Sequence, residues 1–222
     1  MTTLPGVLRA AETGTFPSAD GGLTIVPPTS PRESAVLAFT AHNVVVTATD
    51  PGWVRGQLPD GDLSAPLNPP FLAALSHRLG RRVNNIDMVT LASPLPGPPP
   101  APLAEIEDRD HPRVARALWY RDDVRVWVTD GGVVLLGRGL GGRWETAVEV
   151  AAEHRGRGLG RTLATAARHL VPDGRPIWAQ IAPGNAASVR VFLASGYLPV
   201  GAEALLVPGG TPRSGEKGAA EP

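Results

Sequence analysis

The chain has 222 residues, of which 42% are hydrophobic, 26 are glycine and 24 are proline, a composition that allows an ordinary buried core. Its 21 Lys and Arg residues balance 21 Asp and Glu residues, which argues against bulk nucleic acid or an anionic membrane as the main partner. It has no cysteine, which excludes disulfides, thiolate zinc sites and a cysteine nucleophile.

The first thirty residues are rich in Gly, Thr, Ser and Pro, and residues 1–30 are predicted to be a loosely ordered start. They lack a charged segment followed by an apolar core, and no apolar run in the sequence is long enough to span a bilayer. A soluble cytoplasmic protein is therefore expected.

Three elements are predicted in the next part of the chain. β-Branched and aromatic residues from Ala35 to Thr49 indicate two strands or one bent strand. Residues 68–80 predict a helix with Asn68 as its cap, Gly80 at its end and one leucine face (Leu72, Leu75 and Leu79). Residues 84–92 then predict a buried strand.

The proline-rich segment "SPLPGPPPAPL", Ser93–Leu103, must be extended, because proline cannot donate a ladder hydrogen bond. We interpret it as a spacer that ends an N-terminal region of unassigned type, residues 1–103. A second domain is predicted over 104–208, and the small, polar residues 209–222 are expected to be a disordered tail.

The second region predicts a more regular series of elements. Alternating valines at 124–128 indicate a strand, Asp130-Gly131 a tight turn, and 133–139 the strand that pairs with the first. The strand at 143–151 places Trp144, Thr146, Val148 and Val150 on one face and Glu145, Ala147 and Glu149 on the other. A helix, a strand at 176–182, a helix at 185–195 and a final strand pair at 197–207 follow.

The turn between the strand at 143–151 and the first helix, "EHRGRGLGRTL", concentrates glycine and arginine where that helix begins. Backbone N–H groups at a helix start have no intrahelical partners, and glycine lets a ligand approach them closely. This pattern favours an anion such as a pyrophosphate, with Arg155, Arg157 and Arg161 at the rim. A bare helix start is the alternative.

The ordered set Arg155-x-x-Gly158-x-Gly160, helix, strand, Asn185-x-x-Ser188 and Gly196-Tyr197 resembles the acetyl-CoA-binding core of the GNAT-type N-acetyltransferases. The resemblance covers roughly Val124–Val207 and does not extend to residues 1–110. It implies an α/β (α+β) fold with a mixed, mainly antiparallel sheet flanked by helices, preceded by a smaller α/β N-terminal region.

The resemblance also implies which residues hold the cofactor, acetyl-CoA. Val148 and Val150 would offer backbone hydrogen bonds to the pantetheine arm, beside a strand that splays from its neighbour. The pyrophosphate would lie on the backbone of the turn, which comprises Arg155, Gly156, Arg157, Gly158, Leu159, Gly160 and Arg161. Asn185 and Ser188 would lie near the pantetheine, with Asn185 also suited to be a helix cap, and Arg190 would reach the nucleotide phosphates or be solvated.

Catalytic chemistry on this scaffold needs a base for the amine and a proton for the departing thiolate. Glu145 and Glu149 are the candidate bases, at most one of them acting; both could instead face solvent or pair with Arg125 or Arg138. The tyrosine that the family often uses as the acid is replaced by Phe192, and Tyr197 is assigned to packing. The histidines have no metal-ligand spacing, so no metal site is predicted.

The sequence therefore predicts an N-acetyltransferase that moves an acetyl group from acetyl-CoA to an amine by direct attack in a ternary complex. The acceptor would be a small amine or an amine of a peptide or protein, with no nucleic acid or membrane partner. The N-terminal half is expected to shape the acceptor site or a homodimer contact. The alternative is a catalytically inactive acyl-CoA-binding regulatory module, as suggested by Phe192.

Overall fold

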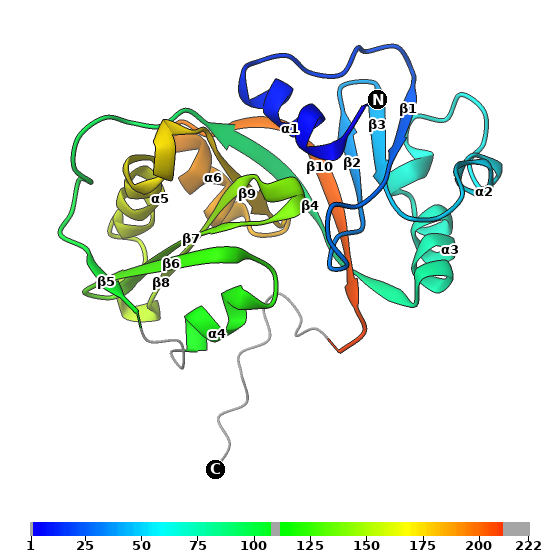
Figure 1. Ribbon diagram of the computed structural model, residues 1–222. Coiled ribbons are helices and arrows are strands. Elements are labelled where there is room, and N and C mark those ends of the chain that lie inside the picture. The colour runs from blue at the N-terminus through cyan, green and yellow to red at the C-terminus, as the bar shows by residue number, and fades with distance from the viewer. Residues whose placement is uncertain (1, 108–111, 211–222) are drawn as a thin grey trace.

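The structure, a computed structural model, describes residues 2–107 and 112–210 (Figure 1). These residues form a ten-stranded sheet in the order β1-β3-β2-β10-β4-β9-β8-β7-β6-β5. The strands are β1 (Leu23–Val26), β2 (Ala35–Phe39), β3 (His42–Val46), β4 (Arg81–Ala92), β5 (Ala104–Ile106), β6 (Asp122–Thr129), β7 (Gly132–Arg138), β8 (Trp144–Val150), β9 (Ile177–Ile181) and β10 (Leu198–Pro208). Only the β1–β3 and β8–β9 pairs of this described sheet are parallel. The mixed, mainly antiparallel fold class predicted from the sequence is confirmed.

Helices cover both faces of the sheet, as Figure 1 shows. They are α1 (Leu4–Glu12), α2 (Pro51–Gly56), α3 (Pro69–Leu79), α4 (Pro112–Leu118), α5 (Leu159–Leu170) and α6 (Ala186–Ala194). Successive strand residues point to opposite faces, so Trp178 packs under α1 while its neighbour Ile177 packs under α5 and α6. By the same alternation α1 and α4 share one face, and α2, α3, α5 and α6 share the other.

Strand β4 joins the two halves of the chain, because it comes from the N-terminal half and pairs with β10 on one side and β9 on the other. The proline-rich segment after it lies against α5, where the backbone N–H of Leu95 donates to the Arg168 carbonyl at 2.8 Å. The division at residue 103 stays a prediction, although the sheet runs continuously across it. The tail expected to be disordered lies outside the described residues from residue 211 onward, and Gly209–Gly210 form a turn.

Several local predictions are confirmed by the structure. The segment from Ala35 to Thr49 forms the two antiparallel strands β2 and β3, and the helix predicted over 68–80 is α3, which ends at Gly80 with a left-handed φ of 61°. Asp130-Gly131 forms the turn between β6 and β7. Such features follow from short-range chemistry, since the turn residues and the helix end determine the backbone there.

The prediction of a loosely ordered start over residues 1–30 is wrong. Helix α1 begins after Thr3, whose side-chain oxygen accepts a hydrogen bond from the Gly6 N–H at 3.2 Å, and it buries Leu4, Leu8 and Ala11 against the sheet. Glu12 at its end binds both Arg175 and the indole N–H of Trp178. The glycine and proline content of this segment led to the wrong prediction, because the segment contains an amphipathic helix that packs on the sheet and binds residues of β9 and the turn before it.

The predicted strand pair at 197–207 is also wrong, because these residues form the single strand β10. Two register irregularities interrupt its pairing with β4, one between Pro199 and Gly201 and one between Ala204 and Leu206. At the second, Leu205 lies opposite both Asn84 and Asn85. Such bulges bend a strand without ending it.

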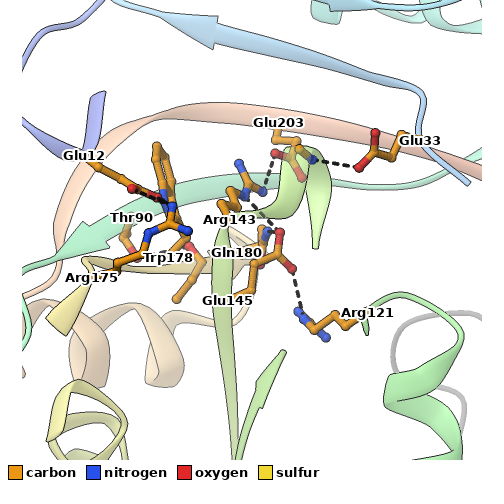
Figure 2. Close-up of polar contacts among 12 residues, drawn as sticks. Glu12, Glu33, Thr90, Arg121, Arg143, Glu145, Arg175, Trp178, Gln180 and Glu203 are labelled. Atoms are coloured by element: carbon orange, nitrogen blue, oxygen red, sulfur yellow. Dashed lines mark hydrogen bonds and ion pairs between the residues drawn. The ribbon is translucent and has the colours of Figure 1, made fainter. Parts of the chain in front are cut away.

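A buried ion-pair cluster connects three strands on the face of the sheet that α1 and α4 share (Figure 2). The side chain of Arg143 is 0% exposed, and its Nε and Nη2 atoms lie 2.9 Å from Glu145 and 2.6 Å from Glu203, respectively. Its guanidinium group lies 5.0 Å from the ring centre of Trp178 on β9. The cluster therefore joins β8, β9 and β10 through a single side chain.

We expect Leu8→Ala to lower the free energy of unfolding by about 2–5 kcal/mol, because Leu8 is 1% exposed in the core under α1. Leu198→Ala is the matched control. It deletes the same side-chain atoms, but Leu198 is 68% exposed, so they are removed from solvent and not from the core. Urea denaturation of both variants measures the difference. Equal effects would contradict the packing of α1 onto the sheet.

We expect Arg143→Met to destabilise the protein by about 3–5 kcal/mol at pH 7, because it leaves Glu203 without its cation and Glu145 with only part of its own. Adding Glu203→Gln should recover part of the loss, since it removes one of the stranded carboxylates. Urea denaturation of the single and double variants tests this. A single variant within about 1 kcal/mol of wild type would contradict the buried cluster.

Candidate functional site

The two parallel strands β8 and β9 meet at one point and then separate. Their register within the described residues is the single pair Glu145↔Trp178, whereas β8 pairs with β7 along its whole length. Beyond Glu145 the edge of β8 that faces β9 is therefore not used for sheet pairing. We call the point where the strands separate the fork, defined by Glu145, Trp178 and Gln180.

The glycine-rich turn lies beyond the open end of the fork, between β8 and α5. Gly156 and Gly158 have left-handed φ values of 74° and 87°, which favour glycine. No side chain caps α5, and a Cβ atom built on either glycine would meet nothing within 4 Å. The first N–H groups of the helix are therefore open to a ligand, and the helix dipole adds partial positive charge there.

The start of α6 lies across the fork from this turn. Asn185 is the helix cap, and its side-chain oxygen accepts a hydrogen bond from the Ser188 N–H at 3.1 Å. This confirms the alternative role given to Asn185 from its sequence position.

A cleft of about 2010 Å³ connects the turn, the fork and the face that carries the ion-pair cluster. It is lined by nearly all residues predicted to bind the cofactor, namely Val148, Val150, Arg155, Gly156, Gly158, Leu159, Gly160, Arg161, Asn185, Ser188 and Arg190. Arg157 is the exception and is exposed outside the lining. The structure thus brings together residues that the sequence separates by one helix and one strand.

One predicted backbone contact is already occupied. The Nε of Arg155 donates to the carbonyl of Val150 at 3.2 Å, which leaves that oxygen less free for a ligand. The guanidinium groups of Arg161 and Arg190 are exposed at the cleft rim. Because these side chains are long and exposed, their guanidinium groups could reach a phosphate bound in the cleft.

Both candidate bases line the cleft, in different environments. Glu145 is buried and accepts hydrogen bonds from Arg143, from Arg121 at 3.0 Å and from the side-chain amide of Gln180 at 2.6 Å (Figure 2). Burial raises the pKa of Glu145, but the attraction of Arg143 and Arg121 outweighs it, so the pKa lies below its usual value. Glu149 is half-buried farther along β8. The partners of Glu145 are not Arg125 or Arg138, which pair with Glu105 and Asp123.

The N-terminal half contributes residues to the cleft that sequence reasoning did not identify, among them Arg32, Glu33, Asn84, Asn85 and Asp87. Asp87 differs from the others because burial and the charge of Glu145 raise its pKa to about 6, against the effect of a 2.6 Å hydrogen bond from Asn85. The sequence could have pointed to Asp87, since it is the only acid in the apolar segment 84–92.

The aromatic pair near α6 is packed and offers no proton donor to the cleft. Phe192 contacts Tyr197 edge-to-face with ring centres 4.9 Å apart. The Tyr197 hydroxyl donates to the Ala164 carbonyl at 3.1 Å, and burial raises the pKa of this phenol. The packing role given to Tyr197 agrees with these contacts.

In the part of the chain that the structure describes, no helix has the length and apolar character needed to cross a bilayer. Nor do residues 2–107 and 112–210 bring three His, Asp or Glu side chains together in a way that could hold a metal ion.

Comparison with known proteins identifies one family. Residues 146–203 match the family described as FR47-like protein, which is related to the GNAT-type N-acetyltransferases. The chain matches no curated protein.

Solved structures similar to this chain include two enzymes described as GCN5-related N-acetyltransferases. The one from Kribbella flavida is 21% identical with a TM-score of 0.40, and the match covers 64% of this chain and 65% of that one. The one from Sphaerobacter thermophilus is 18% identical with a TM-score of 0.37, covering 61% and 55%. The chain thus spans less than two thirds of the length of either enzyme.

The segment matched by the family model contains β8 from Thr146 onward, the glycine-rich turn, α5, β9, α6 and β10 as far as Glu203. It includes Gln180 and Trp178 of the fork and the residues of the cleft around the glycine-rich turn. The resemblance to the GNAT-type N-acetyltransferases, which the sequence motifs carry, is thereby confirmed over residues 146–203.

Proposed function

We propose that the chain is an N-acetyltransferase that moves an acetyl group from acetyl-CoA to an amine. The observation that carries the proposal is the fork, whose open side leads without interruption from an uncapped, glycine-lined helix start to a face rich in ionisable groups. An extended acyl carrier and an amine could therefore reach the same point from opposite sides of the sheet. Direct attack in a ternary complex fits a chain without cysteine.

The residues of the turn fit a diphosphate. The space over Gly156 and Gly158 is where a Cβ atom would intrude, and N–H groups of Leu159 and Gly160 belong to the uncapped first turn of α5. The free edge of β8 at Val148 suits an extended arm that pairs like a strand. Acetyl-CoA, when bound, supplies an activated acetyl group as a thioester.

Of the two bases predicted from the sequence, Glu145 is disfavoured by its contacts. Glu145 is fully committed to Arg143, Arg121 and Gln180, and its low pKa makes it a poor proton acceptor. We assign it the role of orienting Gln180 and Arg121. A homodimer and a cytoplasmic location stay predictions.

A catalytically inactive acyl-CoA-binding module is the second candidate. It is favoured by the burial of Phe192 and by the commitment of the Tyr197 hydroxyl to Ala164, which leave no proton donor in the usual place. A departing thiolate can, however, take its proton from water in an open cleft. The two candidates share the cofactor and differ in turnover.

We expect millimolar CoA to raise the melting temperature of the wild-type protein and Gly158→Ala to remove most of that shift. The added Cβ strains a backbone with φ of 87° and enters the space proposed for the diphosphate. A ligand at 100 times its Kd would add about 2.7 kcal/mol of stability. Differential scanning fluorimetry measures the shift.

Gly14→Ala is the matched control, because Gly14 has a φ of 83°, an equally open Cβ position and no place in the cleft. Both variants should melt earlier than wild type without ligand, and only Gly158→Ala should lose the CoA response. A wild-type protein that ignores CoA, or a Gly158→Ala variant that responds fully, would contradict the proposed cofactor site.

We further expect wild-type protein to release free thiol from acetyl-CoA in the presence of an amine and not in its absence. A panel of polyamines, aminoglycosides, amino acid esters and lysine peptides covers the acceptor classes, and a thiol-reactive dye measures release. The inactive module predicts a CoA-dependent melting shift with no release for any amine, and that result would overturn the enzymatic proposal.

A further inference from the structure

Three carboxylates lie close enough on one face of the sheet, at the fork, to influence one another's pKa values. They are Asp87, Glu145 and Glu203. Asp87 on β4 lies directly opposite Glu203 on β10, and the charges of Asp87 and Glu145 each raise the pKa of Glu203. Two cations, Arg143 and Arg121, are bound to Glu145 and Glu203. Asp87 is the carboxylate of this group that makes no ion pair within the described residues.

Position favours Asp87 as the group that faces an incoming amine. It lines the cleft, and β4 holds it next to β9, where Val89 pairs with Gln180. Asp87 and Gln180 are therefore diagonal neighbours on one face, and such neighbours lie about 7–8 Å apart with their Cβ atoms somewhat closer. This separation leaves room for one nitrogen to contact both side chains at the fork.

Gln180 provides an independent indication that an N–H donor binds there. Its side-chain nitrogen must donate to the Glu145 carboxylate, which fixes the orientation of the amide. Its carbonyl oxygen is buried and has no hydrogen-bond partner among the described residues. A buried unpaired acceptor that lines a cleft is satisfied when a donor binds.

We propose that Asp87 accepts a proton from the ammonium group of the acceptor while the Gln180 carbonyl binds the same nitrogen. This inference rests on the proposed function. The proton leaves nitrogen for a carboxylate oxygen of Asp87, and the freed lone pair forms the carbon–nitrogen bond as the carbon–sulfur bond breaks. The nitrogen loses its second proton, the thiolate gains one, and Asp87 returns its own to water through the open cleft.

The surroundings of Asp87 suit this role. Glu203 from β10 and Glu145 from β8 face it as acids, Arg143 lies beyond them, and β9 presents the neutral Gln180. Burial and the neighbouring charge of Glu145 raise its pKa to about 6. The group is thus mostly ionised at neutral pH, yet it holds a proton better than an ordinary carboxylate.

The test uses the full chain, acetyl-CoA and the amine of the panel that gives the fastest thiol release. Wild-type kcat/KM should fall tenfold per pH unit below about pH 6, where Asp87 becomes protonated. Above that pH the wild-type kcat/KM should level off. Asp87→Asn should lower kcat/KM at pH 7 about 100-fold and lose the break near pH 6, so that its rate keeps rising with pH through the neutral range as free amine accumulates. Asp87→Glu should restore part of the rate and the break.

Controls separate this role from damage to the cofactor site. Asp87→Asn should keep the wild-type melting shift with CoA, and Asp60→Asn, an exposed acid outside the cleft, should keep wild-type kinetics. A break near pH 6 retained in Asp87→Asn, or removed by Glu149→Gln instead, would overturn the assignment to Asp87 alone. No release with any amine would overturn the proposed function and this inference together.

A measurement without an acceptor tests the same carboxylate. The raised pKa means that folding disfavours the ionised form of Asp87. Ionised Asp87 therefore lowers the free energy of unfolding fully above about pH 6, and this loss of stability disappears below the ordinary pKa of 3.8. Asp87→Asn should therefore melt higher than wild type at pH 8, with a smaller gain at pH 5. A melting temperature that falls at pH 8 would contradict the unfavourable setting of Asp87.

Discussion

The guanidinium group of Arg143 lies at the closed end of the fork and connects the three strands on which the rest of the site depends. It binds Glu145 on β8 and Glu203 on β10 and lies over Trp178 on β9, at the one position where β8 and β9 are in register. A buried ion pair contributes little net stability, because desolvation offsets most of the attraction. Its contribution here is geometric, since it fixes the strands at the closed end of the fork and leaves them free to separate beyond it.

The N-terminal half completes this arrangement from the other side. Without β4, strands β9 and β10 would have no common neighbour, and the cluster that spans them would face solvent. The same strand carries Asp87 and the bulged pair Asn84 and Asn85 into the cleft. The half of the chain with no recognisable motif thus contributes to the part of the cleft that we propose for the acceptor, while the half with the motifs contributes the part that we propose for the cofactor.

Sequence reasoning succeeded where short-range chemistry determines structure. The end of α3 at Gly80, the turn at Asp130-Gly131, the cap at Asn185 and the glycine turn before α5 all follow from residues within one or two turns of each other. It failed for β10, whose course is set by its pairing with β4, more than 100 residues earlier in the chain. It also failed for α1, where the cap at Thr3 and the spacing of Leu4, Leu8 and Ala11 were local signals that the glycine- and proline-rich composition outweighed.

The site shows the same division. That Glu145 points away from the valine face could be inferred from strand alternation, and Arg143, two residues earlier, shares that face. Its other partners could not be found, because Arg121, Gln180 and Glu203 come from three separate elements. Asp87 could have been noticed as an acid in an apolar strand, but the sequence did not show that Glu203 and Glu145 lie beside it.

On the face of the sheet that carries Arg143, Glu145 is bound to arginines and Asp87 is not. This difference bears on how an amine could be deprotonated near neutral pH. In water an ammonium group holds its proton far more tightly than an aspartate does, so transfer between them is strongly unfavourable. Burial raises the pKa of a carboxyl and lowers that of an ammonium, which brings the two values together from both sides. Glu145 cannot take part, because Arg143 and Arg121 hold its pKa low. Asp87 makes no ion pair within the described residues, so the charge of the proposed acceptor would supply the cation that this carboxylate lacks.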